Sequence, residues 1–196
     1  MPAIISLTQR VKTLFAVNTT TICGVRTVGE VMKLLVLSDS HSALRFMRQC
    51  VNAVRPDAII HLGDHYDDAV AIREEFPHIP MHQVPGNCDR FRCPPGTHEV
   101  LCYDVGGVRL YMTHGHRHNV KYDLGLLLRD ARSMGAAAAL YGHTHMRDCR
   151  QEDDGLWVLN PGSCGYGGGS AGLIETRDGT IIACRLLMPG DLEETI

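Results

Sequence analysis

Five short polar motifs, each directly after an apolar segment, carry the residue types that could perform chemistry in this chain. Their side chains are imidazole, carboxylate and amide groups without clustered thiolates, a donor set that suits Mn, Fe, Zn, Co or Ni ions. Any one motif alone is better explained as a helix cap or a turn. Their joint occurrence favours a metal centre. The motifs are Asp39-Ser40-His41, Gly63-Asp64, Gly86-Asn87-Cys88-Asp89, Thr113-His114-Gly115-His116 and Gly142-His143-Thr144-His145.

Alternating strand-like and helix-like segments must position the first three motifs. Apolar runs at residues 32–39, 58–62 and 79–84 predict buried strands, and residues 42–54 and 69–76 predict helices. Such a βαβαβ order favours parallel strands with helices packed outside. Since ligands of open α/β sheets sit beyond the carboxyl ends of the strands, we expect the motifs to meet at one edge.

The later part of the chain predicts a hairpin, one helix and further strands. The turn Val105-Gly106-Gly107 separates two strand-like segments, and the glycine-rich residues 165–169 predict a flexible loop. No repeat and no second core is evident. The remaining predicted elements are strands at 98–104, 108–113, 137–141, 156–159, 171–175 and 180–186, and a helix at 123–134.

Composition narrows the possible partners. The 196 residues predict one domain, and the formal net charge of -3 offers no general attraction for long nucleic acid. No apolar run approaches the eighteen or so residues of a membrane span. The eight cysteines include no C-x-x-C pair, so we expect free thiols and a cytoplasmic location.

Residues 1–31 differ from the rest of the chain. Arg10 and Lys12 interrupt the first apolar stretch, so the segment does not have the pattern of a secretory signal. We expect residues 1–31 to be an N-terminal extension, with Met32 as the true start and residues 32–196 as the folded domain.

The ordered motifs resemble those of the calcineurin-like metallophosphoesterases, which are D-x-H, G-D, G-N-x-[DE], a His-bearing block and G-H-x-H. Their order and short spacing are most similar to the small prokaryotic YfcE-type phosphodiesterases and to their relative, the retromer vacuolar sorting subunit. The resemblance implies an α/β metallo-dependent phosphatase fold. This fold is a four-layer αββα sandwich of two mixed β-sheets flanked by helices.

The resemblance also implies two divalent metal ions, with Mn²⁺ expected and Ni²⁺, Co²⁺, Fe²⁺ or Zn²⁺ also compatible. A hydroxide bridging the ions would attack a small phosphodiester, with Asp64 and Asn87 in the catalytic centre. The implied ligands are Asp39, His41 and His145 for the first ion, Asn87, His114 and His143 for the second, and Asp64 as the bridge.

Cys88 departs from the pattern of the wider family, in which many members have histidine directly after the motif asparagine. A neutral thiol is a poor proton donor at neutral pH, so we expect activity on diesters with good leaving groups and weak activity on alkyl monoesters. Asp89 is expected to orient the histidines or to cap a turn. His65 could face the substrate, and His116 is expected behind the ligands or exposed. Residues 160–163, Asn-Pro-Gly-Ser, are expected to form a supporting turn.

Three alternatives remain open from the sequence. The retromer relative indicates that this fold can be a non-catalytic protein-interaction scaffold, which predicts lost or altered ligands. A metallo-β-lactamase-type site needs H-x-H-x-D-H, and Arg117-His118-Asn119 supplies no aspartate there. A nuclease is disfavoured by the net charge and the scarcity of aromatic residues. A homo-oligomer is compatible with the sequence.

Overall fold

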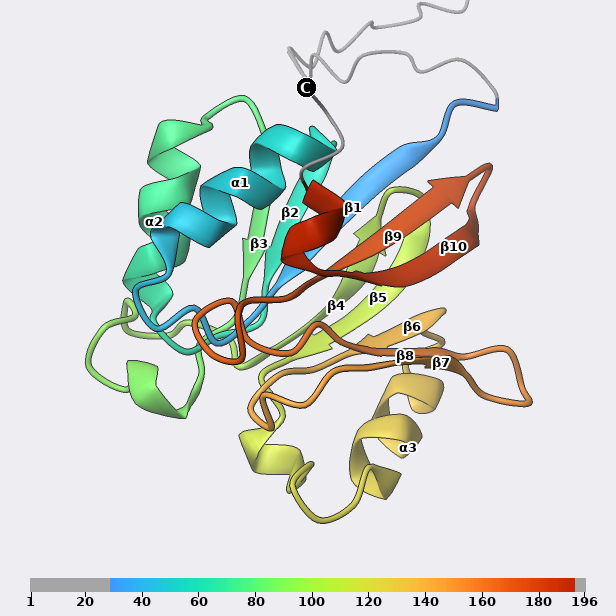
Figure 1. Ribbon diagram of the computed structural model, residues 1–196. Helices are drawn as coiled ribbons and strands as arrows, with labels where there is room; N and C mark the ends of the chain where they lie inside the picture. The colour runs from blue at the N-terminus through green and yellow to red at the C-terminus, as the bar shows by residue number, and fades with distance from the viewer. Residues whose placement is uncertain (1–28, 193–196) are drawn as a thin grey trace, which may run out of the picture.

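The computed structural model describes residues 29–192, which form two five-stranded mixed sheets packed face to face with three α-helices outside them (Figure 1). Residues 1–28, which make up nearly all of the predicted N-terminal extension, lie outside the described residues. Within residues 29–192, no helix is both long and apolar enough to cross a membrane.

The first sheet has the strand order β10-β9-β1-β2-β3. Its strands β1, β2 and β3 are parallel, as the βαβαβ pattern predicts, and β9 pairs antiparallel with both β1 and β10. Helices α1 and α2 pack on its outer face (Figure 1). The bounds are β1 Met32–Leu37, α1 Leu44–Val54, β2 Ala58–His61, α2 Tyr66–Glu75, β3 Met81–Gln83, β9 Ala171–Arg177 and β10 Thr180–Leu187.

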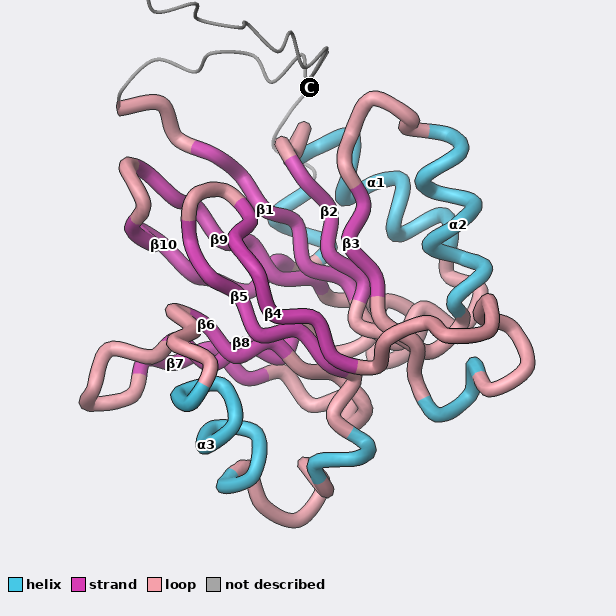
Figure 2. The backbone as a smooth tube through the Cα atoms, turned by 180° about the vertical axis from the view of Figure 1, so that it is seen from behind, coloured by secondary structure: helices cyan, strands magenta, loops and turns pink. Residues whose placement is uncertain are grey.

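The second sheet has the order β4-β5-β6-β8-β7 and carries α3 on its outer face (Figure 2). Strands β5, β6 and β8 are parallel, whereas β4 and β7 run antiparallel at the two edges. The bounds are β4 Val100–Val105, β5 Val108–Thr113, α3 Gly125–Ser133, β6 Ala138–Leu140, β7 Asp148–Gln151 and β8 Trp157–Asn160, with short 3-10 turns at Asn87–Asp89, His116–His118 and Pro189–Leu192.

The alternation of side chains in β1 explains the layers. Leu34 and Val36 point into the core between the sheets, while Leu35 and Leu37 point into the cluster beneath α1 and α2. All four side chains are fully buried, as a central strand covered on both faces requires. The predicted αββα architecture is therefore confirmed.

Strand β7 is absent from the sequence-based prediction. Its residues, Asp148–Gln151, are polar and partly exposed, so they lack the apolar pattern of a buried strand. Pairing with β8 creates this edge strand. On β8, Trp157 pairs with Ala138 of β6 and packs against the core between the sheets.

Ile60 and Ile182 provide a matched test of the inter-sheet core. Ile60 is fully buried between the sheets, whereas Ile182 on β10 is 46% exposed. We expect Ile60→Ala to lower the free energy of unfolding by about 2 to 5 kcal/mol, because it leaves a cavity in a packed core. Ile182→Ala should cost less than about 1 kcal/mol. Urea denaturation followed by far-UV circular dichroism measures both, and equal losses would contradict this description of the core.

Candidate metal centre

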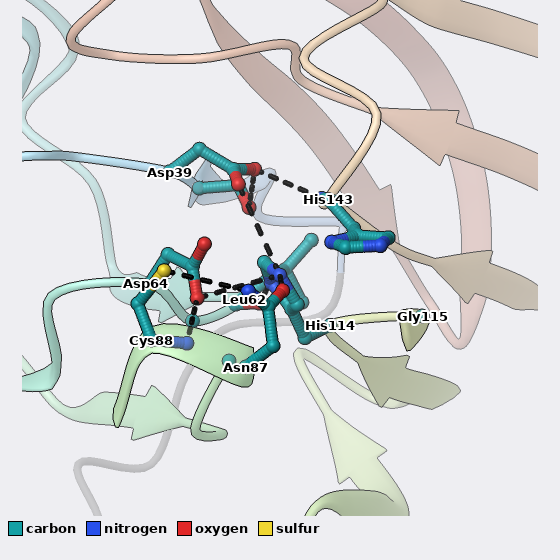
Figure 3. A network of polar contacts seen from close by, with 12 residues as sticks. Asp39, Leu62, Asp64, Asn87, Cys88, His114, Gly115 and His143 are labelled. Atoms are coloured by element: carbon teal, nitrogen blue, oxygen red, sulfur yellow. Dashed lines mark hydrogen bonds and ion pairs between the residues drawn. The ribbon is translucent and has the colours of Figure 1, made fainter. Parts of the chain in front are cut away.

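The five predicted motifs meet at one edge of the sandwich. Asp39, Asp64 and Asn87 follow β1, β2 and β3 of the first sheet. His114 follows β5, and His143 follows β6, both in the second sheet. Figure 3 shows Asp39, Asp64, Asn87 and His114 close to one another, with the ring of His143 to one side. The site is therefore built jointly by the two sheets.

Glycines allow the motif loops to approach one another. A Cβ atom on Gly63 would lie 2.5 Å from the backbone nitrogen of Gly86, and one on Gly86 would overlap the Asp64 carboxylate. A Cβ on Gly142 would overlap the Ser38 hydroxyl and lie 2.7 Å from Asp39 Oδ2. Larger residues would push the loops apart, so these glycines are required by packing.

The donor residues themselves lie in an uncommon backbone region. Asp39, His41, Asp64, His143 and His145 all have left-handed φ angles, from 42° to 68°. Non-glycine residues rarely adopt this conformation, and clusters of such residues are typical of functional sites. These residues all lie in the loops that follow β1, β2 and β6, at the sheet edge.

A first group of possible ligand atoms comes from Asp39, His41 and His145, all within 4.8 Å of one another. His145 Nε2 lies 3.1 Å from Asp39 Oδ1. Asp39 Oδ1 and His41 Nε2 are buried, and neither atom has a hydrogen-bond partner within residues 29–192. Buried polar atoms without partners are rare, and a bound cation would satisfy both.

A second group joins Asp39 and Asp64 to His114. His114 Nε2 lies 3.5 Å from Asp64 Oδ1 and 3.1 Å from Asn87 Oδ1. His114 Nδ1 lies 2.8 Å from the carbonyl oxygen of Leu62. Since a carbonyl only accepts, Nδ1 carries the proton and donates it, which leaves the Nε2 lone pair directed into the site.

His143 belongs to neither group among residues 29–192, although its ring centroid lies 5.0 Å from that of His114. Its backbone N–H donates to Asp39 Oδ2 at 3.0 Å. Ser38 Oγ donates to the same oxygen at 2.6 Å. These two hydrogen bonds orient the Asp39 carboxylate and leave its Oδ1 atom facing the histidines.

Burial dominates the electrostatics of the site. It raises the pKa of Asp39 to about 7, with the neighbouring Asp64 charge acting in the same direction. Burial lowers the pKa of His114 to about 3, so its imidazole is neutral at physiological pH. A neutral imidazole beside two buried carboxylates fits a divalent cation.

The structure also places the residues next to the predicted ligands. Asp89 is buried and accepts hydrogen bonds from the backbone N–H groups of Tyr66 and Gly86, at 2.8 and 2.7 Å. It therefore ties the start of α2 to the Gly86 loop. The Cys88 backbone N–H donates to Asp64 Oδ1 at 2.9 Å, and the Cys88 side chain is exposed.

The remaining predicted histidines surround the two groups. The ring of His65 lies 4.9 Å from that of His41, and His116 lies 5.5 Å from His114. His118 instead lies 2.9 Å from the Tyr111 hydroxyl on the α3 side. The H-x-H-x-H run therefore does not act as one ligand set.

The turn at residues 160–163 supports the site from behind. Asn160 Nδ2 donates to the carbonyl of Gly142, and Asn160 Oδ1 accepts from the backbone of Gly162. Ser163 Oγ donates to the backbone carbonyl of Asp39 at 2.7 Å. This turn links the loops after β1 and β6.

Sequence reasoning missed Ser38 and Tyr166. Tyr166 lies in the glycine-rich loop, where its ring stacks on His145 with a centroid distance of 5.1 Å and also contacts His41 edge to face. It is 56% exposed, so it forms a wall of the site open to solvent. An aromatic residue alone among glycines is the one signal that could have indicated it.

Fold and donor geometry together define a metallophosphoesterase-like protein, and comparison with known proteins supports this class. Residues 32–179 match the calcineurin-like phosphoesterase superfamily domain. Since this match covers most of the chain, the protein belongs to that superfamily.

Curated relatives and solved structures agree with the family. A probable metallophosphoesterase of Mycoplasma pneumoniae is 29% identical over 67% of this chain and 78% of its own length. The phosphodiesterase MJ0936 of Methanocaldococcus jannaschii is 27% identical over 74% and 94%, respectively.

Among solved structures, a predicted phosphoesterase from Streptococcus pneumoniae TIGR4 aligns with a TM-score of 0.65 and 25% identity, covering 81% of this chain and 90% of its own. Vacuolar protein sorting 29 from Cryptosporidium parvum shares the fold with a TM-score of 0.61 and 16% identity, covering 83% of this chain and all of its own.

The raised pKa of Asp39 predicts a pH-dependent effect of Asp39→Asn in protein stripped of metal. The native carboxyl is protonated below about pH 7, whereas the unfolded one ionises near pH 4. The free energy of unfolding of the wild type therefore falls as the pH rises through this range. The Asn variant does not share this loss, because Asn cannot ionise. We expect the variant to be more stable than wild type by roughly 1 to 3 kcal/mol at pH 8, with the difference shrinking toward pH 4.5.

Urea denaturation at the two pH values measures the effect. Asp104→Asn is the matched control, because Asp104 is an exposed carboxylate on β4 paired with Arg109. A difference between Asp39→Asn and wild type that does not change with pH would contradict the prediction.

Proposed function

We propose that this protein is a dinuclear-metal phosphoesterase that hydrolyses phosphodiester bonds of small substrates. The observation that carries the proposal is the convergence of carboxylate and imidazole groups from both sheets in two overlapping groups, with the Asn87 amide oxygen 3.1 Å from His114. Membership of the calcineurin-like superfamily and the phosphodiesterase name of the M. jannaschii relative support it. Mn²⁺ is the expected metal, and Ni²⁺, Co²⁺, Fe²⁺ and Zn²⁺ have compatible ligand preferences.

In this proposal the chain divides the donors between two ions. Once bound, two divalent ions supply positive charge that polarises phosphoryl oxygens and acidifies a water molecule. Asp64 is assigned to both ions because it lies in contact distance of His114 and in the same group as Asp39. The assigned ligands are Asp39, His41 and His145 for one ion and Asn87, His114 and His143 for the other.

The protein holds the donors in fixed orientations before any substrate arrives. The Leu62 carbonyl sets the tautomer of His114, and Ser38 with the His143 backbone orients Asp39. The Cys88 N–H holds Asp64 through its Oδ1 atom. Preorganised polar groups of this kind need no reorganisation as charge develops on the phosphoryl group.

The identity of residue 88 restricts the leaving groups in this proposal. Partial desolvation, together with the hydrogen bond and charge of the Asp64 carboxylate, raises the pKa of the Cys88 thiol to about 11. The thiol is therefore neutral and a weak acid at neutral pH, which favours diesters whose leaving groups depart without protonation.

The alternative is a non-catalytic interaction scaffold. The vacuolar protein sorting 29 structures share this fold, which favours that role. The donor set argues against it, since every predicted ligand position carries a competent donor. A wild-type protein that binds Mn²⁺ but shows no turnover of bis-p-nitrophenyl phosphate would favour the scaffold.

Replacing the shared carboxylate tests the catalytic centre. We expect Asp64→Asn to lower the Mn²⁺-dependent hydrolysis of bis-p-nitrophenyl phosphate at least about a hundredfold, because one charge that serves both ions is removed. Release of p-nitrophenolate measures the rate, and metal analysis measures the bound ions. Asp104→Asn should keep the wild-type rate, and full activity of Asp64→Asn would refute the role of Asp64.

Two substitutions at position 88 test the leaving-group argument. Cys88→His should raise the hydrolysis of a diester with an alkyl leaving group by at least about tenfold, because imidazolium can protonate the departing oxygen. Cys88→Ser should change the rates on alkyl and nitrophenyl diesters by less than about fivefold. Loss of all activity in Cys88→Ser would instead indicate direct participation of the thiol.

A further inference from the structure

A cleft of about 570 Å³ opens beside the candidate metal centre, between the loop before α3 and the segment after β6. Its walls are largely apolar and come from Val120, Leu124, Tyr141 and Met146. Val120 and Tyr141 are buried, whereas Met146 is 73% exposed at the rim. Volume and lining are in the range of small-molecule sites.

The cleft and the metal centre share one stretch of backbone. Thr144, which lines the cleft, stands between His143 and His145, which are assigned to different ions. Lys121 also lines the cleft, and its ammonium group is near enough to act electrostatically on Asp39, His143 and His145. The loop that carries two of the assigned ligands therefore also forms one wall of the cleft.

Two cationic residues line this cleft without forming an ion pair in the described part of the chain. Among residues 29–192, neither Lys121 nor Arg147 forms an ion pair with a carboxylate, although Lys121 acts on Asp39 at longer range. The guanidinium of Arg147 donates to the sulfur of Met188 at 3.0 Å. The one carboxylate of the lining, Asp148, accepts from the Tyr141 hydroxyl and pairs with Arg150 outside the cleft. The cleft thus combines apolar walls with two cationic residues that form no ion pair within residues 29–192.

We propose that this cleft binds one ester substituent of the substrate, and that this substituent is an aromatic or similarly flat apolar group with a negative charge of its own. The apolar walls would hold the ring, and Lys121 and Arg147 would hold the anionic group. The inference deepens the proposed function and rests on it for the position of the phosphorus. It assigns Lys121 and Arg147 as residues that determine specificity.

Three p-nitrophenyl diesters test the assignment, with methyl, phenyl or 4-carboxyphenyl as the second group. In each reaction water adds to phosphorus, the P–O bond to p-nitrophenolate breaks, and the second group stays on the phosphate product. With Mn²⁺-loaded wild type, we expect kcat/KM to rise from methyl to phenyl, and at least about fivefold further to 4-carboxyphenyl.

In the double variant Lys121→Met/Arg147→Met, the kcat/KM for the 4-carboxyphenyl ester should be about equal to the kcat/KM for the phenyl ester, so that the ratio of the two is about one. Arg73→Met, which removes an exposed cation from α2, is the matched control and should keep the wild-type ratio. A wild-type ratio near one, or a ratio that the double variant retains, would overturn the assignment.

A binding measurement separates this inference from the proposed function. Calorimetric titration with 4-carboxyphenyl phosphate and with phenyl phosphate needs no turnover. If wild type hydrolyses none of the diesters, the proposed function fails. The cleft assignment is supported independently if wild type binds 4-carboxyphenyl phosphate at least about fivefold more tightly than phenyl phosphate and the double variant loses this preference. The assignment is refuted if wild type binds the two ligands with equal affinity.

Discussion

The packing of one sheet against the other is the constraint on which the candidate site depends. Asp39, Asp64 and Asn87 belong to the first sheet, whereas the histidines after β5 and β6 belong to the second. Neither sheet alone carries a complete donor set. The buried layer that includes Leu34 and Ile60 therefore sets the distance between the two halves of the site as well as the stability of the fold. Sliding of one sheet over the other would separate the donors.

Local strain and close approach are concentrated where the chemistry is expected. The motif glycines remove side chains where loops touch, and the donors beside them adopt left-handed backbone angles. Such conformations are unfavourable for each residue alone, and the surrounding hydrogen bonds maintain them. Ser163 shows how this works, since it fixes the Asp39 backbone from a turn 124 residues further along the chain. The motif residues and their distant supports form one unit.

Most elements could be predicted from the sequence because their apolar periodicity is strong, as in α1 and in β1. Strand β7 could not be predicted, because its residues have no apolar pattern. It is a strand because it pairs with β8. The placement of the motif residues at the sheet edge was predictable because each motif follows an apolar run. Tyr166 was not, because its contact with His145 depends on the return of a distant loop to the sheet edge. The only local signal of this contact is an aromatic residue standing alone among glycines, and that signal does not say what the residue contacts.

The position of Trp157 has a practical consequence, because it is the only tryptophan in the chain. Its indole packs on the layer between the sheets, opposite Ala138 at the amino end of β6, while His143 and His145 follow the carboxyl end of that strand. Intrinsic fluorescence excited at the indole therefore reports on a single location. It gives an optical probe of sheet separation that stands apart from the donors, without any introduced dye.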